Sequence, residues 1–506
     1  MNMKLTVEGS LNLSYAQTLC LIFFPGSKFA QTQEENPNAP HVRICTQART
    51  EGVYARAEIT ADGKFSSYEC TEPYREQYPL VRTEKIAAGR AMLKAGEALL
   101  GYTPPWGIMT GVRPAKLAQQ LHSAGLRSEE VRRTLTKEYF VNPKKAMLLT
   151  KVARNERRVM KKLGKQPTCS VYISIPFCPS RCAYCSFVAY STKRLLSLIP
   201  AYLERLKRDI VSTFSTIRGL GLRVATIYIG GGTPTILSAD QIADLLACIG
   251  TCVDPASLLE YTMEAGRPDT ITPEKLRAAL AGGVNRISIN PQTLNDNILK
   301  NIGRNHTTED FYRAFHIARE CGIQYINTDL IAGLPGDSFS GFSKSMDEII
   351  RLAPENITVH TFSVKKSADI LKSDSMIYSR TGGDTAKSVD YSQLQTALAE
   401  YLPYYIYRQK NTVGNLENVG FAKKGAEGLY NIFMMEEVHS IFACGAGAVT
   451  KLVAPGETHI ERIFMPKYPY EYLNLPQDDS VRQQILDFYA GNWGIYEKNG
   501  DASSHR

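Results

Sequence analysis

Three cysteines lie within the segment FCPSRCAYCSF, residues 177–187. Cys178, Cys182 and Cys185 have the spacing C-x3-C-x2-C. In a reducing compartment, thiols this close together usually hold a metal. A structural zinc site would need a second pair of ligands, and a disulfide would leave one thiol over. Iron–sulfur cubanes normally use four thiolates, so three would leave one iron open to coordinate a substrate.

A glycine-rich stretch and a carboxylate follow two of the predicted strands. The segment IGGGTPT, residues 229–235, has three successive glycines, which let backbone approach a ligand closely and leave amide groups to point at it. Glu264 ends the strand in MEAGRPDT, where it is either a ligand-binding acid or the cap of the next helix. The cysteine triplet one strand earlier favours a shared binding site.

Three more polar residues lie near later strand ends. Gln292 follows the strand in NRISINPQT, Arg304 comes shortly after it in NIGRNH, and Asp329 lies inside the strand in NTDLIAGLPG. A buried aspartate in a parallel strand is costly unless it is bonded to something. These side chains therefore are candidates for the same site.

An alternating strand–helix pattern must position these residues. Six short apolar segments predict strands at 170–175, 224–229, 259–265, 286–290, 325–331 and 357–362. Amphipathic helices, such as 199–217 and 310–322, lie between them. This order predicts an α/β fold, a parallel sheet with right-handed crossovers in which ligand-handling residues follow the strands.

The pattern of apolar and polar residues changes near residues 165 and 365, which predicts three domains. Residues 1–165 form an α+β domain, 166–365 the strand–helix array, and 366–506 a mixed C-terminal domain. Asp62-Gly63 predicts a hairpin turn, and 19–26 predicts a buried strand. Helices are predicted at 83–100, 144–165, 392–409 and 479–490, the second of them with its basic residues on a solvated face.

Composition narrows the location and the partners. Apolar runs fall short of the ~18–20 residues that a membrane span needs, and the N-terminus lacks a secretory pattern, so we expect a cytoplasmic protein. The net charge of +9 suits nucleic acid, an anionic small molecule or an acidic protein equally well. Seven of the remaining cysteines are scattered and are read as buried free thiols.

The segment YISIPFCPSRCAYC, residues 172–185, resembles the signature of the radical S-adenosylmethionine (SAM) enzymes. The other motifs resemble the oxygen-independent coproporphyrinogen III dehydrogenases among them. Over residues 1–165 only a Firmicute-type subgroup is similar, through WGIMTGVRPAKL. The resemblance implies a partial (β/α)6 barrel in which Cys178, Cys182 and Cys185 hold a 4Fe-4S cluster. The reduced cluster of that family splits SAM into methionine and a 5′-deoxyadenosyl radical.

The resemblance also implies a set of SAM contacts. The residues at matching positions are Tyr172, Tyr184, Gly231, Gly232, Thr233, Glu264, Gln292, Arg304, Asp329, Ser363 and Val449. The last two match weaker contact positions, and packing explains Val449 equally well. The implied reaction converts two propionates of coproporphyrinogen III to vinyl groups in porphyrin synthesis. The implied partners are an anionic tetrapyrrole and a flavodoxin- or ferredoxin-type electron donor, with nucleic acid disfavoured.

Two departures leave the substrate open. The oxidases proper carry a fourth cysteine where this chain has Phe187, and branches with phenylalanine there include haem chaperones. The chaperones' His-Asn-x-x-Tyr-Trp stretch matches residues 430–435 here, where Tyr430 replaces the histidine. The alternatives are therefore a haem-binding or haem-transfer protein, or a radical SAM enzyme acting on another tetrapyrrole. For residues 1–165 the hypotheses are a substrate lid, an electron-donor docking surface and an RNA-binding appendage.

Overall fold

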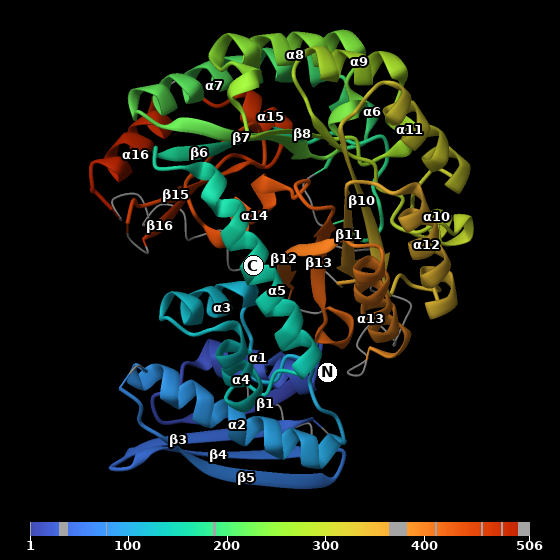
Figure 1. Ribbon diagram of the computed structural model, residues 1–506. Helices are drawn as coiled ribbons and strands as arrows, with labels where there is room; N and C mark the ends of the chain where they lie inside the picture. Colours follow the sequence, from blue (N-terminus) through green and yellow to red (C-terminus); the bar gives the residue numbers. More distant parts are fainter. Residues whose placement is uncertain are drawn as a thin grey trace.

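The computed structural model shows a separate N-terminal sheet at one end and a larger curved sheet wrapped by helices at the other (Figure 1). The structure describes residues 2–29, 39–76, 78–185, 189–363, 382–409, 412–456, 459–476 and 479–493. No helix among these residues is long and apolar enough to cross a membrane.

The N-terminal sheet has five strands in the order β2-β1-β3-β4-β5. The strands are β1 (Asn2–Glu8), β2 (Lys28–Phe29), β3 (His41–Arg49), β4 (Gly52–Ala61) and β5 (Lys64–Pro73). Helices α1 (Leu13–Phe23) and α2 (Leu80–Leu100) share its apolar core. Asp62 and Gly63 both have positive φ, 52° and 70°, and close the β4–β5 hairpin, as predicted.

Helix α1 corrects the strand predicted at 19–26. Its buried residues include Ala16, Leu19, Cys20 and Phe23, a helical spacing that continues upstream of the apolar run. The side chain of Asn12 accepts a hydrogen bond from the amide of Tyr15 and caps the helix. A short apolar run alone does not distinguish a strand from one end of a buried helix.

Six parallel strands form the centre of the second sheet and confirm the predicted α/β array. They are β6 (Thr168–Ile175), β7 (Arg223–Gly231), β8 (Glu260–Glu264), β9 (Arg286–Ser288), β10 (Tyr325–Ala332) and β11 (Asn356–Thr361). Each pairs in parallel with the next in chain order. The outer face is covered by α7 (Ile199–Gly219), α8 (Ala239–Cys252), α9 (Pro273–Ala281), α11 (Thr308–Glu320) and α12 (Phe339–Leu352) (Figure 1).

The C-terminal region extends this sheet at both edges. Strands β13 (Glu417–Ala422) and β12 (Leu402–Arg408) continue beyond β11, while β14 (Ile441–Cys444), β15 (Val449–Val453) and β16 (Ile460–Phe464) continue beyond β6. The eleven strands form an open, partial barrel. Its other helices include α13 (Gly383–Leu398), α14 (Leu429–Glu436), α15 (Pro469–Leu473) and α16 (Ser480–Tyr489). The helix predicted at 392–409 is thus half wrong, because its second part is β12, whereas α16 is as predicted.

Most buried residues between 106 and 153 pack into the barrel core, whereas Ile108 belongs to the N-terminal core. The segment 106–160 carries α3 (Pro114–Ser123), α4 (Ser128–Lys137) and α5 (Pro143–Met160). The amide of Arg408 on β12 donates to the carbonyl of Val112 at 2.7 Å, and the Trp106 indole donates to Glu417 at 2.9 Å. Lys145, predicted on a solvated face, is instead buried and paired with Glu417 at 2.7 Å. The segment therefore covers the edge of β12. The division at residue 165 stays a proposal.

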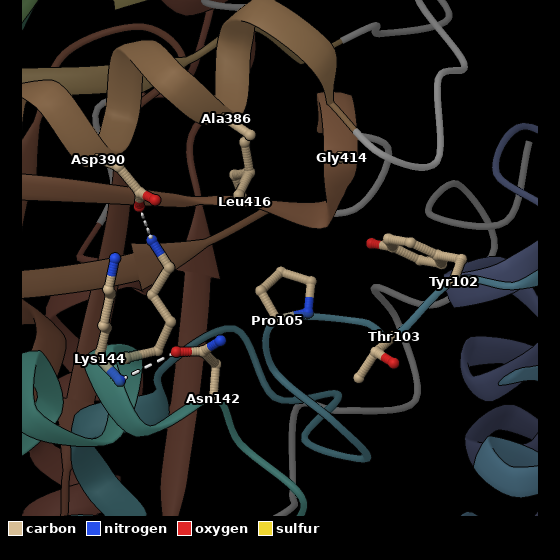
Figure 2. Close-up of a pocket in the computed structure, with 10 residues that line it drawn as sticks. Tyr102, Thr103, Pro105, Asn142, Lys144, Ala386, Asp390, Gly414 and Leu416 are labelled. Atoms are coloured by element: carbon tan, nitrogen blue, oxygen red, sulfur yellow. Dashed lines mark hydrogen bonds and ion pairs between the residues drawn. The ribbon is translucent and has the colours of Figure 1, made fainter.

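A cavity of about 250 Å³ lies where this segment meets the barrel (Figure 2). Tyr102 and Pro105 line one side, and Lys144, Asp390 and Leu416 line the other. None of the residues predicted for the cysteine site lines this cavity.

Candidate active site

The three cysteines lie on one loop directly after β6, where the predicted barrel places ligand-binding residues. The amide of Cys178 donates to the carbonyl of Tyr190 at 3.0 Å, and the amide of Cys185 donates to Cys182 at 3.1 Å. The amide of Ala183 donates to Ile302 at 3.0 Å, which ties the loop to the end of α10 (Asp296–Asn301). The loop is thus fixed at both ends. Phe187 lies outside the described residues.

The thiols are near one another but have not converged. Among the described residues, no group of three or more histidine, cysteine or carboxylate side chains stands at the spacing that holds a metal ion. Burial raises the pKa of Cys178 to about 11, and negative charge on Cys185 and Cys182 acts in the same direction. Arg267, which is buried, lies 3.9 Å from the Cys182 sulfur through Nη1. A nearby cation favours the thiolate form of cysteine, which is the form that binds a metal. The three thiols beside Arg267 therefore fit a thiolate-bound cluster.

The glycine-rich turn packs against the cysteine loop. The amides of Gly232 and Thr233 donate to the carbonyls of Ile175 and Phe177, each at 2.8 Å, so they are not free to point at a ligand as the sequence suggested. A Cβ on Gly232 would lie 2.4 Å from the carbonyl oxygen of Phe177. The turn therefore needs glycine because two backbones touch there. Thr233 also lies 3.3 Å from the Cys178 sulfur through Oγ1.

Glu264 lies at the end of β8 beside a group of stacked tyrosines. Tyr228 donates to Glu264 at 2.5 Å, and the Tyr228 and Tyr430 ring centroids are 4.6 Å apart. Tyr172 stacks on both rings at 6.1 and 6.4 Å. Burial raises the pKa of Glu264 to about 7, and the charge of Asp329 adds to the effect. A cation bound beside Glu264 would therefore lower its pKa and favour its ionised form.

Arg304 joins three parts of the site. Its Nη1 donates to the carbonyls of Gly266 at 3.1 Å and Asn290 at 2.6 Å, after β8 and β9. Its Nε donates to the hydroxyl of Tyr184, in the cysteine loop, at 3.2 Å. Burial raises the pKa of Tyr184, so this phenol stays neutral. The arginine holds the loop against the ends of two strands.

Gln292, which follows β9, lies beside Asp329, which is inside β10. Gln292 is buried with φ of 71°, and its amide donates to the carbonyl of Asp329 at 3.0 Å. Among the residues that the structure describes, its Oε1 has no hydrogen-bond partner. Asp329 accepts from Asn327 at 2.7 Å and lies 3.5 Å from Nε2 of His360. A strained, buried amide with an unpaired oxygen is the kind of group that a ligand satisfies.

The two weaker candidates lie at different edges. Ser363 follows β11 and bridges to Thr412. Val449 begins β15, two strands from β6, and pairs with Phe464. The sequence motifs do not predict Tyr228 or Arg267, although both contact a candidate residue. Their positions just before GGG and just after Glu264 could have suggested them.

Residues 172–349 match the family described as the Radical SAM superfamily, and the barrel with its cysteine loop is therefore a radical SAM domain. The oxygen-independent coproporphyrinogen-III oxidase-like protein HemZ of Bacillus subtilis is 35% identical over 465 residues, covering 90% of this chain and 91% of the relative. The chain thus belongs to the coproporphyrinogen-III oxidase-like family within that superfamily.

Two further similarities are to a heme chaperone and to a solved coproporphyrinogen III oxidase. The heme chaperone HemW of Bacillus subtilis is 31% identical over 318 residues, covering 60% of this chain and 77% of that protein. The solved structure of coproporphyrinogen III oxidase (HemN) from Escherichia coli, a radical SAM enzyme, has a TM-score of 0.44 at 21% identity, covering 60% and 67% of the two chains.

Proposed function

We propose that this protein is a radical SAM enzyme that decarboxylates two propionate side chains of coproporphyrinogen III to vinyl groups, giving protoporphyrinogen IX. The observation that carries the proposal is the cysteine loop itself. Arg267 lies beside the Cys182 thiol of this loop, and Thr233 lies beside the Cys178 thiol. Arg304 donates to Tyr184 in the same loop. Family membership supports the same chemistry.

Cys178, Cys182 and Cys185 would hold a 4Fe-4S cluster, which requires their side chains to converge. When bound and reduced, such a cluster supplies the electron that cleaves SAM and releases a 5′-deoxyadenosyl radical. The chain's own task is to exclude water from this radical and to orient its target. The buried loop contacts of Arg304 serve the first task, since they close the loop onto the strands.

The remaining candidates would bind SAM through its charges. Glu264 faces the barrel interior with a pKa of about 7, and an ammonium group beside it would favour its ionised form. Arg304 is a buried cation suited to a carboxylate, and Asp329 to ribose hydroxyls. Tyr172, Tyr184, Gln292 and the Gly231–Thr233 turn would complete the walls, with Ser363 and Val449 at the margin.

The substrate would be an anionic tetrapyrrole. The tyrosine group of Tyr172, Tyr228 and Tyr430 offers flat, apolar rings inside the barrel. Tyr172 and Tyr228 are only half-buried, so their rings leave apolar surface for a macrocycle, and the net charge of +9 suits its carboxylates.

Haem handling is the second candidate, favoured by the similarity to heme chaperones. One observation weighs against it. Tyr430, which stands where those chaperones carry a histidine, is 6% exposed and stacked on Tyr228. Burial beside Glu264 and Glu260 raises its pKa, which disfavours the tyrosinate that would ligate iron. His439 is likewise committed, to Ser170 at 2.8 Å and Thr168 at 2.9 Å.

The test uses anaerobically reconstituted, reduced protein with SAM, with and without coproporphyrinogen III. Products are separated by chromatography and identified by mass, with Cys182→Ala as control. We expect protoporphyrinogen IX and 5′-deoxyadenosine, both lost in the control. SAM cleavage without a tetrapyrrole product would make the substrate wrong, and neither product from cluster-loaded protein would favour haem handling.

A further inference from the structure

We propose that a surface next to the cysteine loop docks an acidic one-electron carrier protein. The surface, here called the cation–tyrosine patch, consists of Arg181, Tyr190, Lys193, Arg194, Lys467, Tyr468 and Tyr470. The inference rests on the proposed function, because a thiolate cluster that must be reduced before each turnover needs a partner to reduce it. It places that partner on the barrel rather than on residues 1–165.

The patch is in direct contact with the cysteine loop. Tyr190 accepts a hydrogen bond from the amide of Cys178 at 3.0 Å, and its own amide donates to Pro176 at 2.9 Å. Its hydroxyl donates to the carbonyl of Lys467 at 3.3 Å. One hydrogen bond therefore separates a cluster-binding cysteine from this surface, which makes it a short route for an electron from outside.

Aromatic rings connect the loop to α15. The ring centroids of Tyr190 and Tyr468 are 5.6 Å apart, and those of Tyr468 and Tyr470 are 5.4 Å apart. Tyr468 and Tyr470 are nevertheless 45% and 47% exposed. Stacked tyrosines offer rigid contact area that loses little conformational entropy on binding. Aromatic and arginine side chains are also the types enriched in protein interfaces.

The charges of the patch are positive and unpaired. Arg181, Lys193, Arg194 and Lys467 are exposed, and within the part of the chain that the structure describes none of them forms an ion pair. Exposed arginines elsewhere do pair, as Arg351 does with Glu348 at 2.6 Å. Glu471 on α15 is an acid near Tyr190, whose pKa its charge raises. The sum is a local positive field that attracts an acidic protein.

The kind of complex also fits. Electron-transfer complexes are small and short-lived, and they depend on charge to reach fast association. Helices α6 (Lys193–Leu196) and α15 lie at the end of the molecule opposite the N-terminal sheet (Figure 1). A partner docked here would not meet residues 1–100.

The test uses an acidic flavodoxin as the probe and a charge-reversed variant, Lys193→Glu/Arg194→Glu/Lys467→Glu. The matched control, Lys137→Glu/Lys151→Glu/Arg154→Glu, makes the same change in net charge on exposed residues of α4 and α5. Calorimetry measures the Kd of oxidised flavodoxin at low salt without any turnover. Stopped-flow absorbance then compares cluster reduction by reduced flavodoxin and by dithionite, which needs no docking.

We expect the patch variant to raise the Kd and slow flavodoxin-driven reduction about tenfold or more, with the difference shrinking as salt rises. Its reduction by dithionite and its SAM cleavage with dithionite should match the unmodified protein. An equal effect in the control variant would overturn the proposal, as would unchanged binding. Loss of single-stranded oligonucleotide binding, with flavodoxin binding intact, would reassign the patch. Failure of the unmodified protein to cleave SAM with dithionite would instead refute the proposed function.

Discussion

The open face of the five-stranded sheet and the strand ends of the barrel differ in how their charged and polar side chains are paired. On the open face of the N-terminal sheet, Arg43 pairs with Glu8 at 2.7 Å and Arg56 pairs with Glu58 at 2.8 Å, all partly in solvent. In the part of the barrel that the structure describes, Glu264 accepts from Tyr228 and forms no ion pair, and the Oε1 of Gln292 has no hydrogen-bond partner. The charged side chains on the exposed face of the N-terminal sheet pair with one another. The barrel site keeps polar groups that we propose a ligand completes.

This difference shows that the barrel site contains buried polar groups that lower the stability of the fold. Buried groups that lack partners cost stability, and they persist where a site needs them. The N-terminal sheet packs its helices against one face and exposes its other face to solvent. We therefore expect substitutions at the barrel site to remove activity. We expect substitutions at the junction, where α5 packs against the barrel through Lys145 and Glu417, to remove stability.

The largest effect is expected from Gly232→Ala. The added Cβ would overlap the carbonyl of Phe177, one residue before Cys178, and would move the cysteine loop. Displacement by about 1 Å costs roughly 100-fold in rate, so 5′-deoxyadenosine formation should fall at least that far. Gly250→Ala on α8, where a Cβ meets nothing within 4 Å, is the control and should keep full activity. Equal activity of the two variants would refute the close packing.

The second effect is on stability at the junction. Lys145→Met leaves the buried Glu417 without its cation, which should cost about 3–5 kcal/mol in the free energy of unfolding measured with urea. Lys144→Met changes the preceding side chain, which is exposed (Figure 2), and should have little effect. Comparable losses from both variants would show that the ion pair does not tie α5 to the barrel.

The third effect depends on pH through Glu264. Its pKa is about 7 in the fold against about 4.5 when unfolded, so its contribution to stability is fully present below pH 4.5 and is lost as pH rises through 7. The loss should be about 2–3 kcal/mol. Glu264→Gln should remove this share of the decline in urea midpoints between pH 5 and 8. Glu436, whose pKa burial also raises to about 7, should keep its own share in that variant.

The smallest effect is expected on the N-terminal sheet. Glu8→Gln removes the partner of Arg43 at a pair that solvent reaches, and salt screens such pairs. The urea midpoint should stay unchanged within error at physiological salt. A clear loss there would break the contrast between the two regions.

Much of this fold could be predicted from the sequence because parallel strands read as short apolar runs. All six barrel strands are found within a few residues of their predicted positions. The misses have a shared cause. In α1 and β12, a run of consecutive apolar or aromatic residues has no clear period, so neighbouring segments decide its structure.

The site could be predicted only in part. Strand ends point to Glu264, Gln292 and Asp329, because such residues gather at one edge of a parallel sheet. The contacts of Tyr430 with Tyr172 could not be predicted, since α14 reaches the barrel interior from far along the chain. Nor could the pairing of Lys145 with Glu417, which depends on how α5 docks.

The most direct test of the account is electron paramagnetic resonance of the reduced, cluster-loaded protein titrated with SAM. Three thiolates from Cys178, Cys182 and Cys185 should hold about four irons per chain and leave one iron open. We therefore expect SAM to shift the spectrum at saturation, and Cys182→Ala to lose the signal. A spectrum that saturating SAM leaves unchanged would contradict the account.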